Sequence, residues 1–236
     1  MLKAVTLDFW ATLVDDRHGA LPRRIDALCQ QLPDIEPERV HSAYSAAWSR
    51  FLDAGSRGWG LPPAAVLSDT LGGLGVSLLP EVYAQTLQYW QRSCLEEPPP
   101  LVPQAAETLQ KLRAQGLRIG LISDTGVSPG RVLRQYLVQV GLRSLFDWLT
   151  FSNETGVTKH HPQAYLLTLR ALGVEPHEAL HVGDSPAPDI TGAQAVGMMA
   201  ALSIEVRDKR RGDEEPDFII ERLTDLPDIL AHRRFR

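Results

Sequence analysis

The hydrophobic positions of the chain follow different periods in different regions. Residues 3–8 form a nearly continuous apolar run that ends at Asp8, which is typical of a strand buried on both faces of a parallel sheet. From Leu21 to about Glu97 the apolar positions recur at helical spacing, and proline stands near the first turn of three of the four segments. We therefore expect a first strand followed by an all-helical insertion.

After this insertion the pattern changes again. The run EEPPP at residues 96–100 ends the last of these helices, because consecutive prolines cannot continue one. Strands are then predicted over residues 117–123, 147–151, 179–184, 198–203 and 217–220. Helices are predicted between them, over residues 104–115, 129–140, 162–172 and 189–196, and a last helix at the end. The alternation predicts an α/β fold with a Rossmann-like parallel sheet covered by helices on both faces. We place the α/β core at residues 1–16 and 98–236 and the helical domain at residues 17–97.

Composition narrows the class of protein. The 236 residues carry a formal net charge of −5, and their basic residues are scattered except at residues 207–211, a run that we interpret as a solvated loop. We therefore expect no nucleic-acid partner. Cys29 and Cys94 both fall in helical segments, which argues against a disulfide framework and for a reducing compartment. The apolar runs are shorter than the roughly 20 residues of a membrane span, and the N-terminus lacks a signal-peptide pattern, so we expect a cytoplasmic protein without a membrane partner.

Polar residues gather where the predicted strands end. Ligands of such sheets bind beyond the carboxyl ends of the strands. Five residues stand at or near these ends, and a sixth follows in the loop after the strand at 147–151: Asp8, Ser123, Asp124, Asp184, Asp189 and Lys159. If the strands are neighbours, one pocket collects carboxylates, a hydroxyl and an ammonium group.

Such a pocket needs positive charge, because neighbouring carboxylates repel one another. Mg²⁺ together with Lys159 would balance them, since Mg²⁺ prefers oxygen ligands and can also accept a substrate phosphate. Asp8 could then attack phosphorus and form an aspartyl-phosphate that water later cleaves. Ser123 and Lys159 would hold the oxygens of the transferring phosphoryl group.

These motifs resemble those of the haloacid dehalogenase-like (HAD) superfamily of hydrolases, subfamily I, whose members carry a helical cap after the first motif. The resemblance covers nearly the whole chain and rests on DFWATL at residues 8–13, LISDT at 121–125, GVTKHHPQAY at 156–165 and HVGDSPAPDITGA at 181–193. It implies that the catalytic residues are Asp8, Lys159 and Ser123. It implies that the phosphate-binding residues are Thr12, Ser123, Asp124 and Lys159. It also implies Mg²⁺ as cofactor, held by Asp8, Asp184, Asp189 and the backbone carbonyl of Trp10.

The sequence departs from the family pattern at two places. Residues 159–162 read Lys-His-His-Pro where many members read Lys-Pro-Asp-Pro. Trp10 replaces the second aspartate, which in phosphatases of the family protonates the leaving group and later activates water. A positioned acid or base contributes roughly 10²- to 10⁴-fold to rate, so this loss should slow the hydrolysis of ordinary phosphate esters.

Three functions remain open. The first is a phosphatase whose leaving group needs little protonation, or whose acid is His41, His160 or His161. The second is a 2-haloacid dehalogenase with an ester intermediate on Asp8 and no metal; Trp10 fits it, but Asp124 and Asp184 do not. The third is a protein that binds a phosphorylated ligand with little or no turnover.

The helical insertion would select the substrate, which we expect to be a small phosphorylated molecule. Its anion contacts could come from four arginines that are otherwise solvated helix residues: Arg23, Arg24, Arg39 and Arg50. Trp48, Trp59 and Trp90 are interpreted as its core or its interface with the sheet. A lysine imine that cleaves phosphonates is excluded for residues 17–97, which contain no lysine. A homodimer stays open as the assembly.

Overall fold

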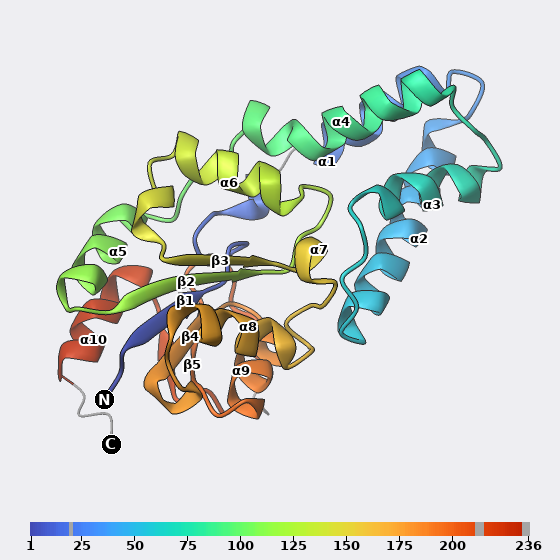
Figure 1. Cartoon of the computed structure of the whole chain (residues 1–236). Helices are drawn as coiled ribbons and strands as arrows, with labels where there is room; N and C mark the ends of the chain where they lie inside the picture. The colour runs from blue at the N-terminus through green and yellow to red at the C-terminus, as the bar shows by residue number, and fades with distance from the viewer. Residues whose placement is uncertain (19–20, 211–214, 233–236) are drawn as a thin grey trace.

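A parallel sheet forms the centre of the computed structural model, which describes residues 1–18, 21–210 and 215–232 (Figure 1). Its strand order is β3-β2-β1-β4-β5-β6, and each neighbouring pair is parallel. The strands are β1 (Ala4–Leu7), β2 (Arg118–Ser123), β3 (Trp148–Phe151), β4 (Ala179–Gly183), β5 (Met199–Ser203) and β6 (Phe218–Ile220). The predicted strands and the α/β fold class are confirmed.

Helices cover both faces of this sheet. The described helices of this part are α5 (Ala105–Ala114), α6 (Gly130–Gln139), α7 (Ser152–Thr155), α8 (Gln163–Leu172), α9 (Gly192–Ala195) and α10 (Leu226–His232). One hydrophobic cluster joins the sheet to α5, α6 and α10, and a second joins its other face to α8 and α9. Buried apolar residues therefore alternate between two layers, as the continuous apolar strands predict.

The register of the sheet sets where the site lies. Leu7 of β1 pairs with Leu121 of β2 on one side and with Val182 of β4 on the other. The three central strands therefore end at nearly the same level. The residues that follow β1, end β2 and follow β4 emerge together at one edge of the sheet, as expected for ligand sites of such folds.

Four helices form a separate group, which we call the helical unit, beyond this edge of the sheet (Figure 1). They are α1 (Leu21–Gln31), α2 (Pro37–Ser56), α3 (Ala64–Leu74) and α4 (Pro80–Glu96). The unit has its own hydrophobic cluster around the fully buried Trp90, with Trp48 packed against it. Trp59 is 63% exposed and lies where the unit meets the sheet domain, because it bridges to Val157. The exact domain boundaries at residues 16/17 and 97/98 stay a prediction.

Backbone hydrogen bonds fasten the end of α2 to the loop after α7. The Gly60 N–H donates to the carbonyl of Gly156 at 2.9 Å. Thr158 donates twice, from its N–H to the Gly58 carbonyl at 3.1 Å and from its hydroxyl to the Gly55 carbonyl at 2.7 Å. A Cβ on Gly60 would lie 2.4 Å from the carbonyl oxygen of Ser152, so this close approach requires glycine.

One predicted element differs. In place of a single helix over residues 189–196, the chain forms a π-helical turn at Pro186–Thr191 and only then the short helix α9. The Asp189 N–H donates to the Ser185 carbonyl at 2.9 Å while the Asp189 carboxylate accepts the Ser185 N–H, so this turn folds back on itself before α9 begins. The wider turn includes Asp189, whose position matters below. Among the described helices, none combines the length and the apolar character that crossing a bilayer requires.

Candidate active site

Lys159 joins two carboxylates at the edge of the sheet. Its Nζ lies 2.6 Å from Oδ1 of Asp8 and 2.5 Å from Oδ1 of Asp189. All three residues are buried, with exposed fractions of 4%, 4% and 0% for Lys159, Asp8 and Asp189. Residues up to 181 positions apart in the sequence thus meet, as the strand-end pattern predicts.

A tight turn follows Asp8. The Asp8 N–H donates to the carbonyl of Val182 at 2.9 Å, which continues the β1–β4 ladder. The chain then reverses, with the N–H of Leu13 donating to the Phe9 carbonyl at 3.0 Å, and Ala11 adopts a φ of 56°. Left-handed backbone costs a non-glycine residue roughly 1–2 kcal/mol. The surrounding packing maintains this turn, which holds Asp8 at the strand end.

Asp189 is held from three sides. Its Oδ2 accepts the Ser185 N–H at 2.9 Å, and its Oδ1 lies 3.1 Å from Nε2 of His181 in addition to Lys159. A Cβ at Gly183 would lie 2.2 Å from Cγ of Asp189, so glycine is required for the carboxylate to fold back over β4. His181 was not predicted from the sequence, although its place within a strand beside the GD pair is the one signal for it.

The carboxylate of Asp184 has a different cationic partner. Lys209 Nζ lies 2.5 Å from Oδ2 of Asp184 and 2.8 Å from the hydroxyl oxygen of Ser185. Lys209 belongs to the basic run at residues 207–211, which the sequence analysis interprets as a solvated loop. The described residues 207–210 do form a partly exposed loop, and the structure adds this ion pair between Lys209 and a buried acid.

The carboxyl groups of this site differ in their ionisation. Burial raises the pKa of Asp8 well above its usual value, and the charges of Asp189 and Asp184 raise it further, while Lys159 opposes the shift. Burial also favours the neutral form of Asp189, but the Lys159 ammonium and the His181 ring outweigh it and lower the pKa of this carboxyl. Burial lowers the pKa of Lys159, yet Asp189 and Asp8 raise it above its usual value, so its ammonium persists. Burial lowers the pKa of His181, which favours a neutral ring.

The donor set suits a hard divalent cation. One carboxylate oxygen from each of Asp8, Asp184 and Asp189 lies within 4.8 Å of the others. Oxygen-only ligands with several carboxylates match the preference of Mg²⁺. The three carboxylates share only two ammonium groups, from Lys159 and Lys209, so one negative charge is left for such a cation to balance.

Two hydroxyl groups, one in the turn after β1 and one at the end of β2, have no partner in the described part of the chain. They are Oγ1 of Thr12 and Oγ of Ser123, and both are buried. Buried polar atoms are normally hydrogen-bonded, so a pair of unpartnered hydroxyls indicates a place for a ligand with acceptor oxygens. Asp124, the next residue after Ser123, accepts the Lys159 N–H at 3.0 Å and so orients the loop that carries this lysine.

The residues considered as a replacement acid lie elsewhere. His41 and His160 are exposed, and the ring of His161 accepts the Gln163 N–H at 3.1 Å. A cavity lies between the helical unit and the loop after β2. Within the described residues, none of the three histidines lines it. Trp10 does line it and packs edge-on against Phe9, with ring centroids 4.8 Å apart.

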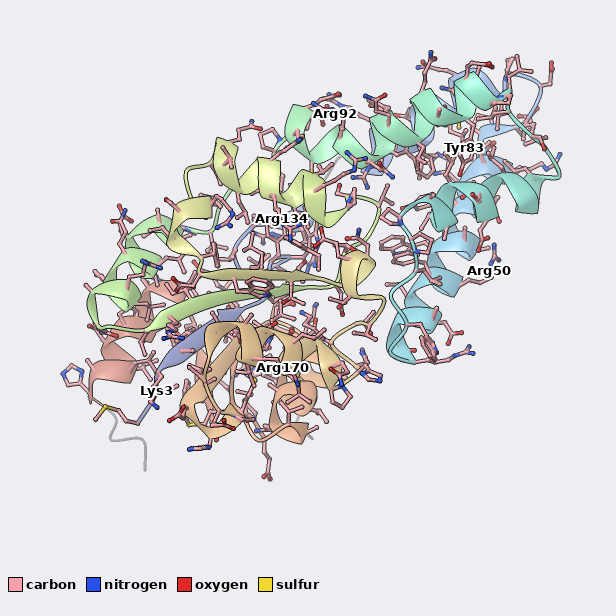
Figure 2. All side chains as sticks on the ribbon, viewed as in Figure 1. Lys3, Arg50, Tyr83, Arg92, Arg134 and Arg170 are labelled. Carbon is pink, nitrogen blue, oxygen red and sulfur yellow. The ribbon has the colours of Figure 1, made fainter. Side chains whose placement is uncertain are left out.

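Of the four arginines predicted as anion contacts, Arg24 alone lines this cavity. Arg23 pairs with Glu97, and Arg39 is exposed. Arg50 pairs with Asp69 and lies on the side of α2 that faces away from the sheet (Figure 2).

Comparison with known families agrees with this geometry. The sequence model of the haloacid dehalogenase-like hydrolase family matches residues 2–197. The chain belongs to this family of hydrolases. The motifs around Asp8, Ser123, Lys159 and Asp184 all fall within the matched range.

Individual relatives include several phosphatases. The chain is 33% identical over 137 residues to glyceraldehyde 3-phosphate phosphatase of Methanopyrus kandleri, a match that covers 54% of this chain and 55% of the relative. It is 32% identical over 164 residues to phosphoserine phosphatase of Thermus thermophilus, with coverages of 68% and 63%. The chain therefore matches about half to two thirds of the length of these curated relatives.

Solved structures match over almost the entire chain. A HAD phosphatase from Thermococcus onnurineus has a TM-score of 0.71 and 26% identity, with 99% of this chain and 100% of that one covered. A 2-haloacid dehalogenase from Pseudomonas syringae pv. Tomato DC3000 has a TM-score of 0.76 and 24% identity, with coverages of 98% and 99%. The second likeness concerns the fold alone.

Proposed function

We propose that this protein is a magnesium-dependent phosphatase that hydrolyses a small phosphate monoester through an aspartyl-phosphate on Asp8. The observation that carries the proposal is the pair of unpartnered, buried hydroxyls of Thr12 and Ser123 near an Asp8 carboxylate that is bonded to Lys159. Hydroxyl and ammonium donors around a carboxylate nucleophile are what a transferring phosphoryl group needs.

The residues have separate roles in this reaction. An Asp8 carboxylate oxygen attacks phosphorus, and the alcohol oxygen leaves with the electron pair of the P–O bond. Thr12, Ser123 and Lys159 donate to the oxygens of the phosphoryl group and stabilise their charge during transfer. Mg²⁺ held by Asp8, Asp184, Asp189 and the Trp10 carbonyl would supply the positive charge that brings the dianionic substrate to an acidic site.

Asp189 positions Lys159, which contacts the proposed nucleophile Asp8. It anchors the Lys159 ammonium between two carboxylates, and His181 in turn holds Asp189 through a ring whose other nitrogen lies 2.8 Å from Oγ1 of Thr6. Lys159 therefore has one orientation, directed at Asp8. Asp124 restrains the same lysine through its backbone.

The alternative function is a 2-haloacid dehalogenase with an ester intermediate on Asp8. Two observations favour it: halide leaves without a proton, so the tryptophan at position 10 costs nothing, and Lys209 neutralises Asp184 without a metal. The acids at Asp184 and Asp124 count against it, since the carboxylate of a small haloacid would lie beside the reacting carbon, close to these acids and without a metal to offset the repulsion. Little or no turnover is the third alternative.

Assays of the purified protein separate these functions. Phosphate release from para-nitrophenyl phosphate and halide release from 2-chloropropionate are measured with Mg²⁺ and with EDTA, for the wild type and for Asp8→Asn. Phosphate release that needs both the metal and Asp8 supports the phosphatase. Halide release that is indifferent to EDTA overturns it, and so does the absence of both products.

A further inference from the structure

A cavity of about 360 Å³ lies between the helical unit and the loop after β2. Its lining includes Trp10 and Asp124, which lie two residues after Asp8 and one residue after Ser123, so the cavity borders the segments that carry the proposed phosphoryl site. A molecule in this cavity would occupy the place of the leaving group of a phosphate ester. The lining of the cavity therefore specifies what that leaving group is.

One wall of the cavity is aromatic. Tyr44, Trp48 and Phe51 line it from a single face of α2. The ring planes are nearly parallel, at 8° between Tyr44 and Trp48 and 8° between Trp48 and Phe51. A Cβ on Gly126 would lie 3.0 Å from the Trp48 ring, so the loop after β2 packs directly on the edge of this ring. An aromatic wall favours a flat apolar group over a flexible polar one.

Arg24 supplies a cation at the same cavity. Its Nε donates to the hydroxyl of Ser93 at 2.6 Å, and an Nη group lies 3.4 Å from the hydroxyl oxygen of Ser128. Among the described residues, no carboxylate pairs with Arg24, and burial lowers its pKa below the usual value for arginine. A partly buried guanidinium with only hydroxyl partners still has N–H donors for an anion.

The acids that line the cavity have partners other than Arg24. Asp16 pairs with Arg207, and Glu97 pairs with Arg23. Asp124 accepts the Lys159 N–H. The cation at Arg24 is therefore available to a ligand.

We propose that the substrate is a phosphate ester of an aromatic hydroxyl whose ring also carries a carboxylate, with the ring against Trp48 and the carboxylate on Arg24. This inference rests on the proposed phosphatase function and names its substrate class. In the first step a bond forms between Asp8 and phosphorus while the P–O bond to the ring oxygen breaks, and a phenolate leaves with the electron pair. Water then cleaves the aspartyl-phosphate, which releases inorganic phosphate and a proton and regenerates the Asp8 carboxylate.

The same substrate class explains the tryptophan at position 10. A phenol ionises near pH 10, as the tyrosine side chain does, so a phenolate leaves without a proton far more readily than an alkoxide. An aryl phosphate therefore needs no acid at position 10 to release its leaving group. The indole of Trp10, which is partly buried and lines the cavity, adds apolar surface for the ring where family phosphatases have a carboxylate.

The test compares 4-carboxyphenyl phosphate with phenyl phosphate, which differ only by the carboxylate. For the wild type we expect a kcat/KM ratio of about 10 to 100 in favour of the carboxylated ester, the size expected of a charge-assisted hydrogen bond. In Arg24→Met this ratio should fall to near one through KM, and Arg24→Lys should retain part of it. Arg39→Met, which changes an exposed arginine outside the cavity, should keep the wild-type ratio.

Binding gives a readout that does not depend on turnover. In Asp8→Asn, we expect 4-carboxyphenyl phosphate to quench tryptophan fluorescence at lower concentration than phenyl phosphate does, and Arg24→Met in the same background should abolish the difference. Circular dichroism establishes that each variant is folded. Equal kcat/KM for both esters, or a ratio that survives in a folded Arg24→Met, overturns the substrate class while the phosphatase stands. If neither ester is hydrolysed in an Asp8-dependent way, the phosphatase itself is wrong.

Discussion

The ammonium nitrogen of Lys209 lies 2.5 Å from Oδ2 of Asp184, and this pair joins a loop near the C-terminus to the acid cluster. Asp184 is one of the three residues whose oxygens could hold a divalent cation. A cation at this carboxylate must therefore compete with an ammonium group supplied by the chain itself. We therefore expect Lys209, which is not a ligand, to limit the affinity of the proposed site for metal.

Removing this competitor should tighten metal binding. We expect Lys209→Met to lower the Kd for Mg²⁺ about three- to tenfold, which corresponds to roughly 1 kcal/mol. Isothermal titration with MgCl2 in low-salt buffer measures the change. Lys3→Met is the matched control, because Lys3 pairs with Glu178 at the other end of the strands (Figure 2). A Kd for Lys209→Met equal to that of the control would contradict the competition.

Lys159 should stabilise the fold in the absence of metal. Lys159→Met leaves the buried carboxylates of Asp8 and Asp189 without their shared cation, and breaking a buried pair typically costs about 3–5 kcal/mol. We expect a loss of this order in the free energy of unfolding, measured by urea titration in EDTA. Adding Asp189→Asn to the same chain should restore part of it, since one unpaired charge is then removed. A single variant as stable as the wild type would refute this role.

The missing acid at position 10 can be put back. We expect Trp10→Asp to increase the kcat of the enzyme for alkyl phosphates such as glycerol phosphate, by about 10²-fold or more, since a positioned acid contributes roughly 10²- to 10⁴-fold. Trp10→Asn introduces a side chain of nearly the same shape as aspartate but without the acid. It therefore controls for the enlarged cavity. Aryl phosphates should gain much less. If Asn and Asp raise the rate equally, proton donation is not the cause.

Gly60 should be essential for fastening the helical unit. A Cβ there meets the Ser152 carbonyl oxygen at 2.4 Å, and only movement of the backbone relieves such a contact. We expect Gly60→Ala to lower the thermal midpoint and to speed proteolysis within residues 57–63. Gly72→Ala is the control: a Cβ at Gly72 meets no atom within 4 Å, and alanine inside α3 should stabilise by about 0.5–1 kcal/mol. Similar stability of the two variants would show that the close approach is unimportant.

The predictable part of the site is the part set by the sheet. Asp8, Ser123 and Asp184 stand at the ends of apolar strands, and parallel strands bring such residues to one edge whatever the helices do. Lys159 and Asp189 followed from their motif spacing. All five lie where the sequence predicts them, although their catalytic and metal-binding roles stay proposals.

The rest of the site depends on contacts between segments that no periodic pattern of apolar residues predicts. Lys209 comes from a charged loop whose pattern indicates only exposure, and its contact with Asp184 depends on where the chain after β5 returns to the sheet. Arg24 shares its helical character with Arg23, and only the docking of α1 against α4 decides which of the two faces the cavity. The π-helical turn at Pro186–Thr191 likewise departs from the predicted helix, and its wider turn has no signature in the spacing of apolar residues.

The hydrogen bonds of Thr158 connect the helical unit to the loop that carries Lys159. Thr158 is bonded to the end of α2 through Gly55 and Gly58, and the next residue is Lys159. A swing of the helical unit that admits substrate or frees product would pull on the peptide that carries the ammonium. Such a movement would weaken the contact between the Lys159 ammonium and Asp8. The nucleophile would therefore be held in position only while the helical unit covers the site.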